Sequence, residues 1–337
     1  MITVTLYYRK EHEASAAAKA DLESIKDKIP HRLVEVDVDS DPALQKNYGD
    51  QVPVIEAGPY SLKAPFDKPK LMMTLGAAKD RRGQLDRLGR EDHHDRLRRG
   101  QSISPGDRFM FWISRHYLAL LNIFVLLYVG LPFLAPVLMK TGSELPARVI
   151  YTIYKPLCHQ FGFRSFFLFG EQAYYPLKEA GIGGVKTFED ATGISDVRNA
   201  TGYSRFQARQ YTGNEVVGYK VALCERDVAI YGGILFFGLT YALTGRRFKP
   251  LHWILWIVIG MGPISLDGFS QLFSQVEWSA LANLLPYRES TPFLRLFTGG
   301  LFGFITAWFA YPYMEESMAD TRQFFIKKFA SIDQSQS

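Results

Sequence analysis

The chain has 337 residues, a formal net charge of +5, 47% hydrophobic residues and 22% charged residues. An aromatic content of 14% and only two cysteines exclude a collagen-like chain, a disordered chain and a small disulfide-rich scaffold. The mean hydropathy of −0.06 hides a division, because charge is concentrated in residues 1–108 and long apolar runs follow. The composition therefore predicts a soluble N-terminal domain attached to an integral membrane domain. In such a protein the excess Lys and Arg belong to cytoplasmic loops, and no nucleic-acid partner is expected.

Residues 1–78 alternate between strand-like and helix-like patterns. The predicted elements are a strand at 2–8, a helix at 14–28, a strand at 32–38, a short helix at 41–48, a β segment at 52–55 and a helix at 67–78. Gly58 and Pro59 supply a turn after the β segment. This is the order of the thioredoxin fold, in which a cis peptide bond precedes the third strand, at the place of Pro53 here. The sequence thus predicts an α/β thioredoxin-like domain.

The start of this domain, from Thr5 through Leu22, resembles a glutaredoxin-like domain. That resemblance implies a Cys-x-x-Cys motif between the first strand and the first helix, but the two places are occupied by His12 and Ser15. Dithiol chemistry needs one thiolate to attack and a second thiol to resolve the mixed disulfide. Because residues 1–78 contain no cysteine, we expect a degenerate domain that acts as a scaffold or docking module.

Residues 79–108 form a charged cytoplasmic linker that is rich in basic side chains. It is either a solvated connection with partial helix or a juxtamembrane segment attracted to anionic lipid. The adjacent histidines His93 and His94 are either solvated or a metal-binding pair.

Residues 109–314 are predicted to form an all-α polytopic membrane domain, followed by a cytoplasmic tail at 315–337. Its apolar runs predict four transmembrane helices, at 117–139, 228–244, 251–273 and 293–313. Basic residues cluster before the first run, between the second and third at Arg246, Arg247 and Lys249, and after the fourth at Lys327 and Lys328. The positive-inside rule then places both termini in the cytoplasm, in a multi-pass protein of the plasma membrane.

The segment 148–170 is aromatic and apolar, but it contains Lys155, His159 and Arg164. Burying these groups in hydrocarbon would cost several kcal/mol. We therefore expect an interfacial or re-entrant segment rather than a fifth span. Residues 171–222 read as an extracytoplasmic insertion, either a loop or a small subdomain, in which Asn199-Ala200-Thr201 matches a glycosylation acceptor.

Four polar motifs separated in the chain are predicted to meet at the outer membrane face. They are Cys158-His159-Gln160 with Arg164-Ser165-Phe166, Cys224-Glu225-Arg226-Asp227 with Ile230-Tyr231, Asp267-Gly268 with Gln271, and Arg288-Glu289-Ser290 with Arg295. These motifs resemble the domain of unknown function 2085 family over roughly residues 147–310, apart from the insertion. The resemblance implies a second cysteine at the position of Asp227, where this chain departs from the family pattern. It implies no established reaction.

The first two motifs offer a candidate zinc site. Cys158, His159, Cys224 and Asp227 provide two thiolates, an imidazole and a carboxylate, which suit a tetrahedral metal. Adjacent Cys and His rarely bind the same ion, so His159 is alternatively a second-sphere residue or a general base. The competing interpretation is a disulfide between Cys158 and Cys224 on an oxidising outer face.

The remaining ionisable residues allow two interpretations. Intramembrane charged groups default to a functional role, whereas a buried salt-bridge network would simply lock the third and fourth spans together. The candidate catalytic residues are His159, Asp267, Gln271, Arg288, Glu289 and Arg295.

Two functions are compatible with these features. The first is a non-catalytic accessory or assembly subunit of a membrane complex, with membrane lipid and other membrane subunits as partners. The second is a metal-dependent membrane enzyme acting on a lipid or envelope substrate. Glycine-rich phosphate loops and nucleophilic triad motifs are absent from the sequence.

Overall fold

The computed structural model describes residues 1–87, 102–195, 197, 202–275 and 287–333. The chain forms two compact units, the first comprising Met1–His116 with Glu316–Ser337 and the second Tyr117–Glu315. The histidine pair His93-His94, most of the basic linker and the Asn199-Ala200-Thr201 acceptor lie outside the described residues.

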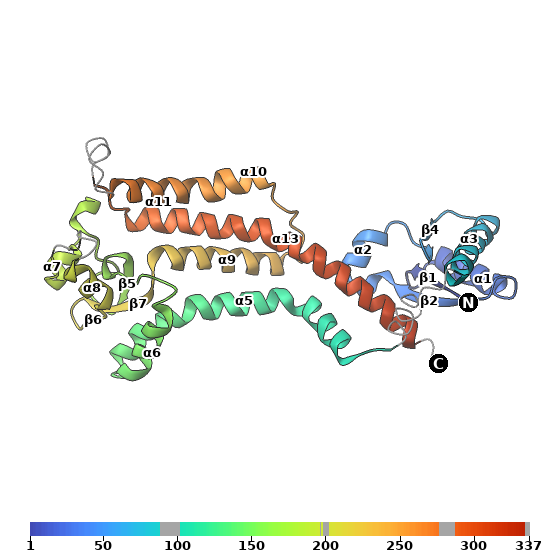
Figure 1. Cartoon of the computed structure of the whole chain (residues 1–337), viewed down its shortest axis with the longest axis horizontal. Coiled ribbons are helices and arrows are strands. Elements are labelled where there is room, and N and C mark those ends of the chain that lie inside the picture. Colours follow the sequence, from blue (N-terminus) through green and yellow to red (C-terminus); the bar gives the residue numbers. More distant parts are fainter. Residues whose placement is uncertain (88–101, 196, 198–201, 276–286, 334–337) are drawn as a thin grey trace. The chain divides into compact units, whose positions relative to one another are not determined.

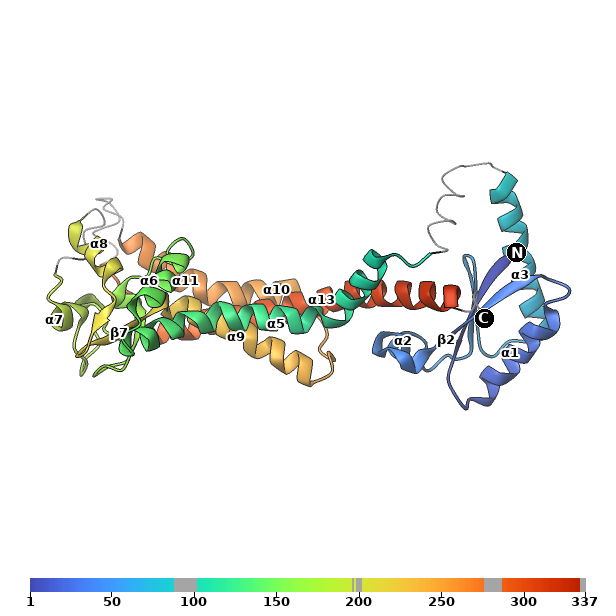
Figure 2. The ribbon, with the colours of Figure 1, turned by 90° about the horizontal axis from the view of Figure 1, so that it is seen from below.

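The first unit contains a mixed four-stranded sheet in the order β2-β1-β3-β4. In Figure 2 the helices α1 and α3 lie on one side of this sheet and α2 lies on the other. β1 pairs in parallel with β2, whereas β1 with β3 and β3 with β4 are antiparallel. The elements are β1 (Ile2–Tyr8), α1 (Glu13–Ile25), β2 (His31–Asp37), η1 (Val38–Ser40), α2 (Pro42–Tyr48), β3 (Val54–Ala57), β4 (Tyr60–Lys63) and α3 (Lys68–Arg87). The predicted mixed α/β character of this region is confirmed, and the Val52–Pro53 peptide bond is cis.

The two faces of the sheet are covered by different helices. Val4 and Leu6 alternate along β1 and pack under α1 and α3. On the opposite face, Tyr7 packs with Leu44 of α2 and with Ile326 from the end of α13 (Pro292–Asp333). The segment expected to be a tail is therefore helical to Asp333 and completes the core of this unit. The sequence prediction missed this contact because the 315–337 segment reads as mostly polar.

The second unit is built on long helices that lie side by side (Figure 1). They are α5 (Pro105–Lys140), α9 (Glu225–Leu243), the run of α10 (Trp253–Leu255), η4 (Trp256–Met261) and α11 (Gly262–Ser274), and α13. Three of them are long and apolar enough to cross a membrane: Pro105–Lys140, Trp253–Ser274 and Pro292–Ile332. α9 coincides with the second predicted span but is not among the three, and its first turn carries Glu225, Arg226 and Asp227.

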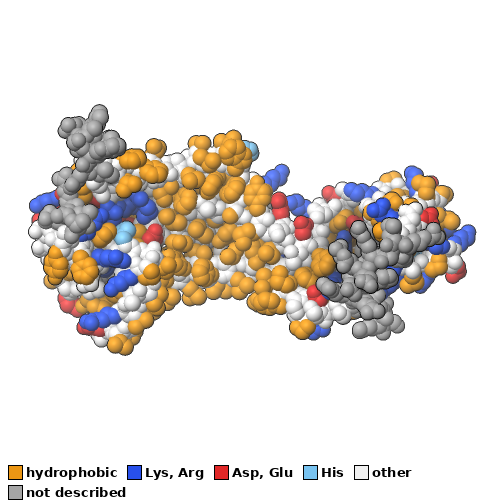
Figure 3. Space-filling view, in the orientation of Figure 1, with side chains coloured by type: hydrophobic (Ala, Val, Ile, Leu, Met, Phe, Trp, Pro, Cys, Tyr) orange, Lys and Arg blue, Asp and Glu red, His pale blue; other side chains and the backbone are white. Residues whose placement is uncertain are grey.

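Glycines allow α9 and α13 to pack with their backbones in close contact. A Cβ atom at Gly303 would lie 1.9 Å from the carbonyl oxygen of Ile230, and one at Gly233 would lie 2.4 Å from that of Gly300. Small residues at such crossings are typical of helix packing in membranes. Hydrophobic side chains cover the visible outer surface of these helices (Figure 3).

The segment 148–170 contains no fifth long helix. It contains the end of α6 (Glu144–Tyr154), the short helix η2 (Gly162–Arg164) and β5 (Ser165–Leu168). The insertion 171–222 folds onto the segment before it, because Phe188 packs in one buried cluster with Phe163 of η2. Its elements are η3 (Lys178–Ala180), α7 (Phe188–Thr192), α8 (Tyr203–Gln210), β6 (Gly213–Asn214) and β7 (Gly218–Cys224), and the sheet order is β5-β7-β6.

Candidate metal centre

The two cysteines are brought together by the small sheet. Cys224 ends β7 and is the residue immediately before α9, and it pairs with Ser165 of β5. Cys158 follows α6 in the segment leading to β5, and its N–H donates to the carbonyl oxygen of Tyr154 over 2.9 Å. Antiparallel pairing of β5 and β7 therefore places Cys224 beside a segment 66 residues earlier in the chain. Both side chains are buried free thiols.

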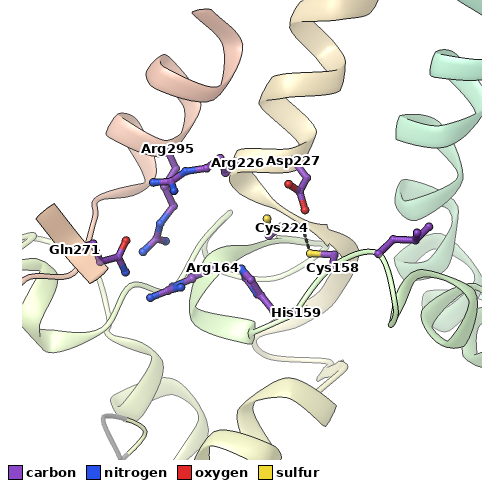
Figure 4. A pocket seen from close by; sticks show the side chains of 9 residues that line it. Cys158, His159, Arg164, Cys224, Arg226, Asp227, Gln271 and Arg295 are labelled. Carbon is purple, nitrogen blue, oxygen red and sulfur yellow. Dashed lines mark hydrogen bonds between the residues drawn. The ribbon is translucent and has the colours of Figure 1, made fainter. Parts of the chain in front are cut away.

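Three of the four predicted ligands form a compact group. The ligand atoms of Cys158, His159 and Cys224 all lie within 4.8 Å of one another, so this group could hold a metal ion. Asp227 lies outside that group but lines the same cavity, and its carboxylate points toward the cysteine pair (Figure 4). Asp227 forms no ion pair within the described part of the chain.

The hydrogen bonding of His159 defines what its ring can do. Its Nδ1 accepts from the backbone N–H of Phe161 over 3.2 Å, which leaves Nε2 as the protonated nitrogen of the neutral ring. Burial, reinforced by Arg164 and Arg295, lowers the pKa of His159 to about 3, so the ring is neutral at physiological pH. A neutral Nε2–H is a hydrogen-bond donor, and direct metal binding would require the tautomer to change. This favours the second-sphere role for His159.

The thiols are arranged to release protons when a metal binds. The backbone N–H groups of Cys224 and Gln160 donate to the Cys158 sulfur over 3.3 and 3.5 Å. The adjacent Cys158 thiol and burial together raise the pKa of Cys224 well above its ordinary value. In the absence of a cation the pair therefore keeps a proton, and metal binding is coupled to its loss.

Gln160 and Lys220 hold the backbone near the two cysteines through hydrogen bonds. The sequence prediction did not select either as a site residue. The amide of Gln160 donates to the carbonyl oxygens of Tyr151 and Ala222, and its backbone has a φ of 53°. The Lys220 ammonium donates to the carbonyl oxygens of Gln160 and Arg209, each over 2.8 Å. Lys220 was not selected because lysine is seldom fully buried, even though the residues that follow it in the sequence are apolar.

Glu289 is the centre of a buried ion-pair network. Arg164 donates to both of its carboxylate oxygens, over 2.7 and 2.9 Å, and Gln271 donates over 2.8 Å. Arg295 also pairs with Glu289 and reaches Glu225 over 3.0 Å. The predicted residues Gln271, Glu289 and Arg295 are therefore in mutual contact, together with Arg164 and Glu225, which were present in the motifs but not selected.

Asp267 is the centre of a second network beside the first. Arg288 donates to it over 2.8 Å, Ser290 donates over 2.7 Å, and Arg226 of α9 also pairs with it. Asp267 is 6% exposed, so its charge is neutralised inside the protein rather than by water. Arg226 was missed as a site residue because basic residues at the ends of membrane helices are usually solvated.

A cavity of about 380 Å³ joins these groups (Figure 4). Its lining residues are Leu157, Cys158, His159, Arg164, Cys224, Arg226, Asp227, Gln271 and Arg295. Asp267 and Glu289 do not line it but pair with its three arginines, and Arg288 pairs in turn with Asp267. The arrangement combines soft metal ligands, a neutral imidazole and guanidinium groups around one cavity. Thiolates are suited to binding a metal ion, and guanidinium groups to binding an anion.

Comparison with known proteins identifies the same region. Residues 215–309 match the family described as "Predicted membrane protein (DUF2085)". That match includes Cys224, Asp227 and Asp267 but begins after Cys158 and His159.

The chain is also 24% identical over 208 residues to an "Uncharacterized protein MJ1492" from Methanocaldococcus jannaschii. The similarity covers 59% of this chain and 93% of the archaeal protein. No solved structure matches the chain.

Proposed function

We propose that the chain is a membrane metalloprotein in which Cys158, Cys224 and Asp227 bind zinc and the site acts on a lipid or envelope substrate. The observation that carries the proposal is the meeting of two buried thiols from distant segments in a polar cavity. Two thiolates and a carboxylate suit Zn²⁺, and three protein ligands leave a fourth position open for water or substrate. Zinc there would act as a Lewis acid.

In this proposal His159 positions the substrate or moves a proton through Nε2. Its neutral ring and its Nδ1 contact with Phe161 support that role. Arg295 and Arg164 bind an anionic group, and Glu289 fixes both guanidinium groups. Asp267 and Gln271 are positioning residues, because Asp267 pairs with Arg226 and Gln271 donates to Glu289. Arg288 acts one step further away, since it pairs with Asp267.

Elemental analysis of the purified full-length protein tests the metal. We expect about one equivalent of zinc per chain, with lower content in Cys224→Ser and Asp227→Asn. Asp190→Asn, an exposed carboxylate of the insertion, is the matched control and should retain the metal. A wild-type protein that folds and retains no metal after dialysis against zinc would refute the proposal.

We also propose that α9 is a fourth span, so that both termini are cytoplasmic and the cavity is on the outer side. α9 packs against α13 through glycines and against α5 through Tyr231 and Tyr128, whose ring centroids are 4.3 Å apart. The three charges in its first turn all face the polar cavity region or its networks. The proposed location is the plasma membrane.

A second candidate function, an accessory or assembly subunit, is favoured by the first unit. Its strand order supports a thioredoxin-like, degenerate glutaredoxin-like fold, and residues 1–78 contain no thiol. Such a domain is suited to binding another subunit of a membrane complex. Gentle solubilisation of native membranes followed by size analysis distinguishes the two functions. Stable migration with other subunits, without metal, would favour this role.

A further inference from the structure

Three guanidinium groups line the cavity from three different elements. Arg164 ends η2, Arg226 is in the first turn of α9, and Arg295 is near the start of α13. In the space-filling view, Lys and Arg side chains gather at this end of the second unit (Figure 3). The planar N–H fork of arginine matches two oxygens of a phosphate group. The positive end of the α9 dipole is at the same place.

These arginines retain donors after their internal pairs are formed. Arg164 uses Nε and Nη2 for Glu289, and Arg226 uses Nη2 for Asp267. The Nε of Arg226 is buried and has no hydrogen-bond partner within the described residues. A buried donor without an acceptor is unfavourable, so this guanidinium group keeps hydrogen-bonding capacity for an anion in the cavity that Arg226 lines.

An apolar stripe leads along α6 to the rim of the cavity. Leu145, Val149, Ile153 and Leu157 recur every four residues and are each more than half exposed. The opposite face of α6, with Tyr151 and Tyr154, is buried. A short amphipathic helix of this kind lies at the boundary between lipid headgroups and acyl chains. Because Leu157 also lines the cavity, the stripe connects the polar site to the membrane.

We infer that the cavity binds the phosphate group of a membrane lipid, with its oxygens on Arg226 and Arg164 and its chains leaving along the α6 stripe. The inference rests on the proposed metal centre, because the unpaired Asp227 carboxylate repels phosphate until a bound cation neutralises it. Glu289 and Asp267 hold the guanidinium groups in position, and some N–H donors of these groups remain available for phosphate oxygens. The cavity of about 380 Å³ suits a headgroup, and the chains remain in the bilayer.

The test is calorimetric titration of the metal-loaded full-length protein in neutral detergent. The probes are a short-chain phosphatidic acid, the matching diacylglycerol and inorganic phosphate. We expect saturable binding of the phosphatidic acid and none of the diacylglycerol. Arg226→Gln should weaken binding about tenfold or more, since a charge-assisted hydrogen bond is lost, while its zinc content is unchanged. Arg247→Gln, an exposed arginine at the other end of α9, is the matched control.

Two further variants keep the test decisive. Arg226→Lys retains the positive charge beside Asp267 but lacks the planar N–H fork of arginine. It should therefore fold and still bind the phosphatidic acid weakly, which keeps the test valid if Arg226→Gln folds poorly. Leu157→Ser should weaken binding of the phosphatidic acid but not of inorganic phosphate. Equal affinity of the wild type for both phosphate compounds would replace the lipid by free phosphate as the ligand and overturn the lipid assignment.

Failure of the inference differs from failure of the metal centre. Metal-loaded protein that binds no phosphate compound, or Arg226→Gln that binds as tightly as the wild type, would overturn the phosphate site and leave the zinc proposal standing. Absence of zinc in the same samples would instead refute the metal centre.

Discussion

The backbone N–H of Cys224 donates a hydrogen bond to the Sγ atom of Cys158 over 3.3 Å, across 66 residues of sequence. The bond exists because β7 ends beside the segment that leads into β5. It orients the Cys158 sulfur as an acceptor, which is the role of a thiolate bound to a metal. The same proximity would also permit a disulfide. The metal-bound and disulfide states differ in the number of thiols that react after denaturation.

Thiol counting separates metal binding from a disulfide. If the pair binds zinc, protein denatured with a chelator and without reductant should show two reactive thiols per chain, one from each cysteine. A disulfide would give none. Asp227→Asn sharpens the comparison, because loss of a ligand should lower metal content and leave the thiol count unchanged. Protein denatured with reductant serves as the reference for complete reaction.

The Glu289 network should dominate the stability of the end of the second unit that carries the small sheet. Glu289→Gln leaves Arg164 and Arg295 without their shared counter-charge in a buried place. Breaking a buried ion pair in this way costs about 3–5 kcal/mol, so the melting temperature of the purified protein should fall strongly. Glu144→Gln, which removes an exposed carboxylate paired with Arg148, should change it little. Equal melting of the two variants would contradict this role for Glu289.

Much of the fold follows from local patterns in the sequence. Alternating apolar residues predict β1 and β2 to within one residue, and the apolar runs predict the four long helices. The ends are less well predicted, because α3 continues to Arg87 through a mostly polar stretch that has no apolar periodicity. Helix α13 likewise continues beyond its apolar part, since Ile326 and Ala330 pack on the sheet of the first unit.

The candidate site follows from the sequence only in part. Charged motifs at the ends of separate membrane helices select Glu289, Asp267 and Arg295, because burial of such groups requires partners. The partners themselves, Arg164 and Glu225, are chosen by tertiary contacts that no local pattern encodes. Asp227 shows the same limit: its spacing from Cys224 suggests a ligand, but in the structure it lies outside the compact Cys-His-Cys group.

Lys220 should make stability depend on pH above neutrality. Burial lowers the pKa of its ammonium from 10.5 to about 7 in the folded chain. Between these values the unfolded chain carries the proton and the folded chain does not, so stability rises with pH across this window. Below about pH 7 both states are protonated and the dependence disappears.

Replacement of the lysine isolates this effect. Lys220→Met should flatten the stability curve between about pH 7 and pH 10, removing a slope of up to about 1.4 kcal/mol per pH unit. Chemical denaturation at several pH values gives the change in the free energy of unfolding per pH unit. Loss of the two hydrogen bonds of the ammonium lowers the free energy of unfolding itself, whereas the pH slope reports the titration of Lys220. Lys186→Met, at an exposed ion pair of the insertion, is the control. Parallel curves for wild type and Lys220→Met would contradict the prediction.

The proposed topology predicts which introduced cysteines react in intact cells. Ser195 and Lys249 are both exposed, and they lie in segments assigned to opposite sides of the membrane. A membrane-impermeant thiol reagent should label Ser195→Cys in intact cells, and Lys249→Cys or Ser102→Cys only after permeabilisation. The unsubstituted chain, with both native cysteines buried, supplies the background. Labelling in the reverse pattern would overturn the assignment of both termini to the cytoplasm.

The first unit should be inert in thiol exchange, and two introduced cysteines should give it a reactive dithiol. His12 precedes α1, and its Nδ1 lies 3.0 Å from the Oγ of Ser15, so the two positions are adjacent at a helix N-terminus. With Cys158 and Cys224 blocked, the native chain should not reduce glutathione disulfide, because it has no other thiol.

The double variant with His12→Cys and Ser15→Cys should gain that activity, since a helix N-terminus lowers the pKa of a thiol and favours the attacking thiolate. Ser15→Cys alone is the matched control. Ser15 is 3% exposed, so a single thiol there is shielded from the substrate and should remain inactive. Exchange by the blocked native chain, or no gain in a folded double variant, would show that the helix terminus does not present these two positions as a glutaredoxin-like site does.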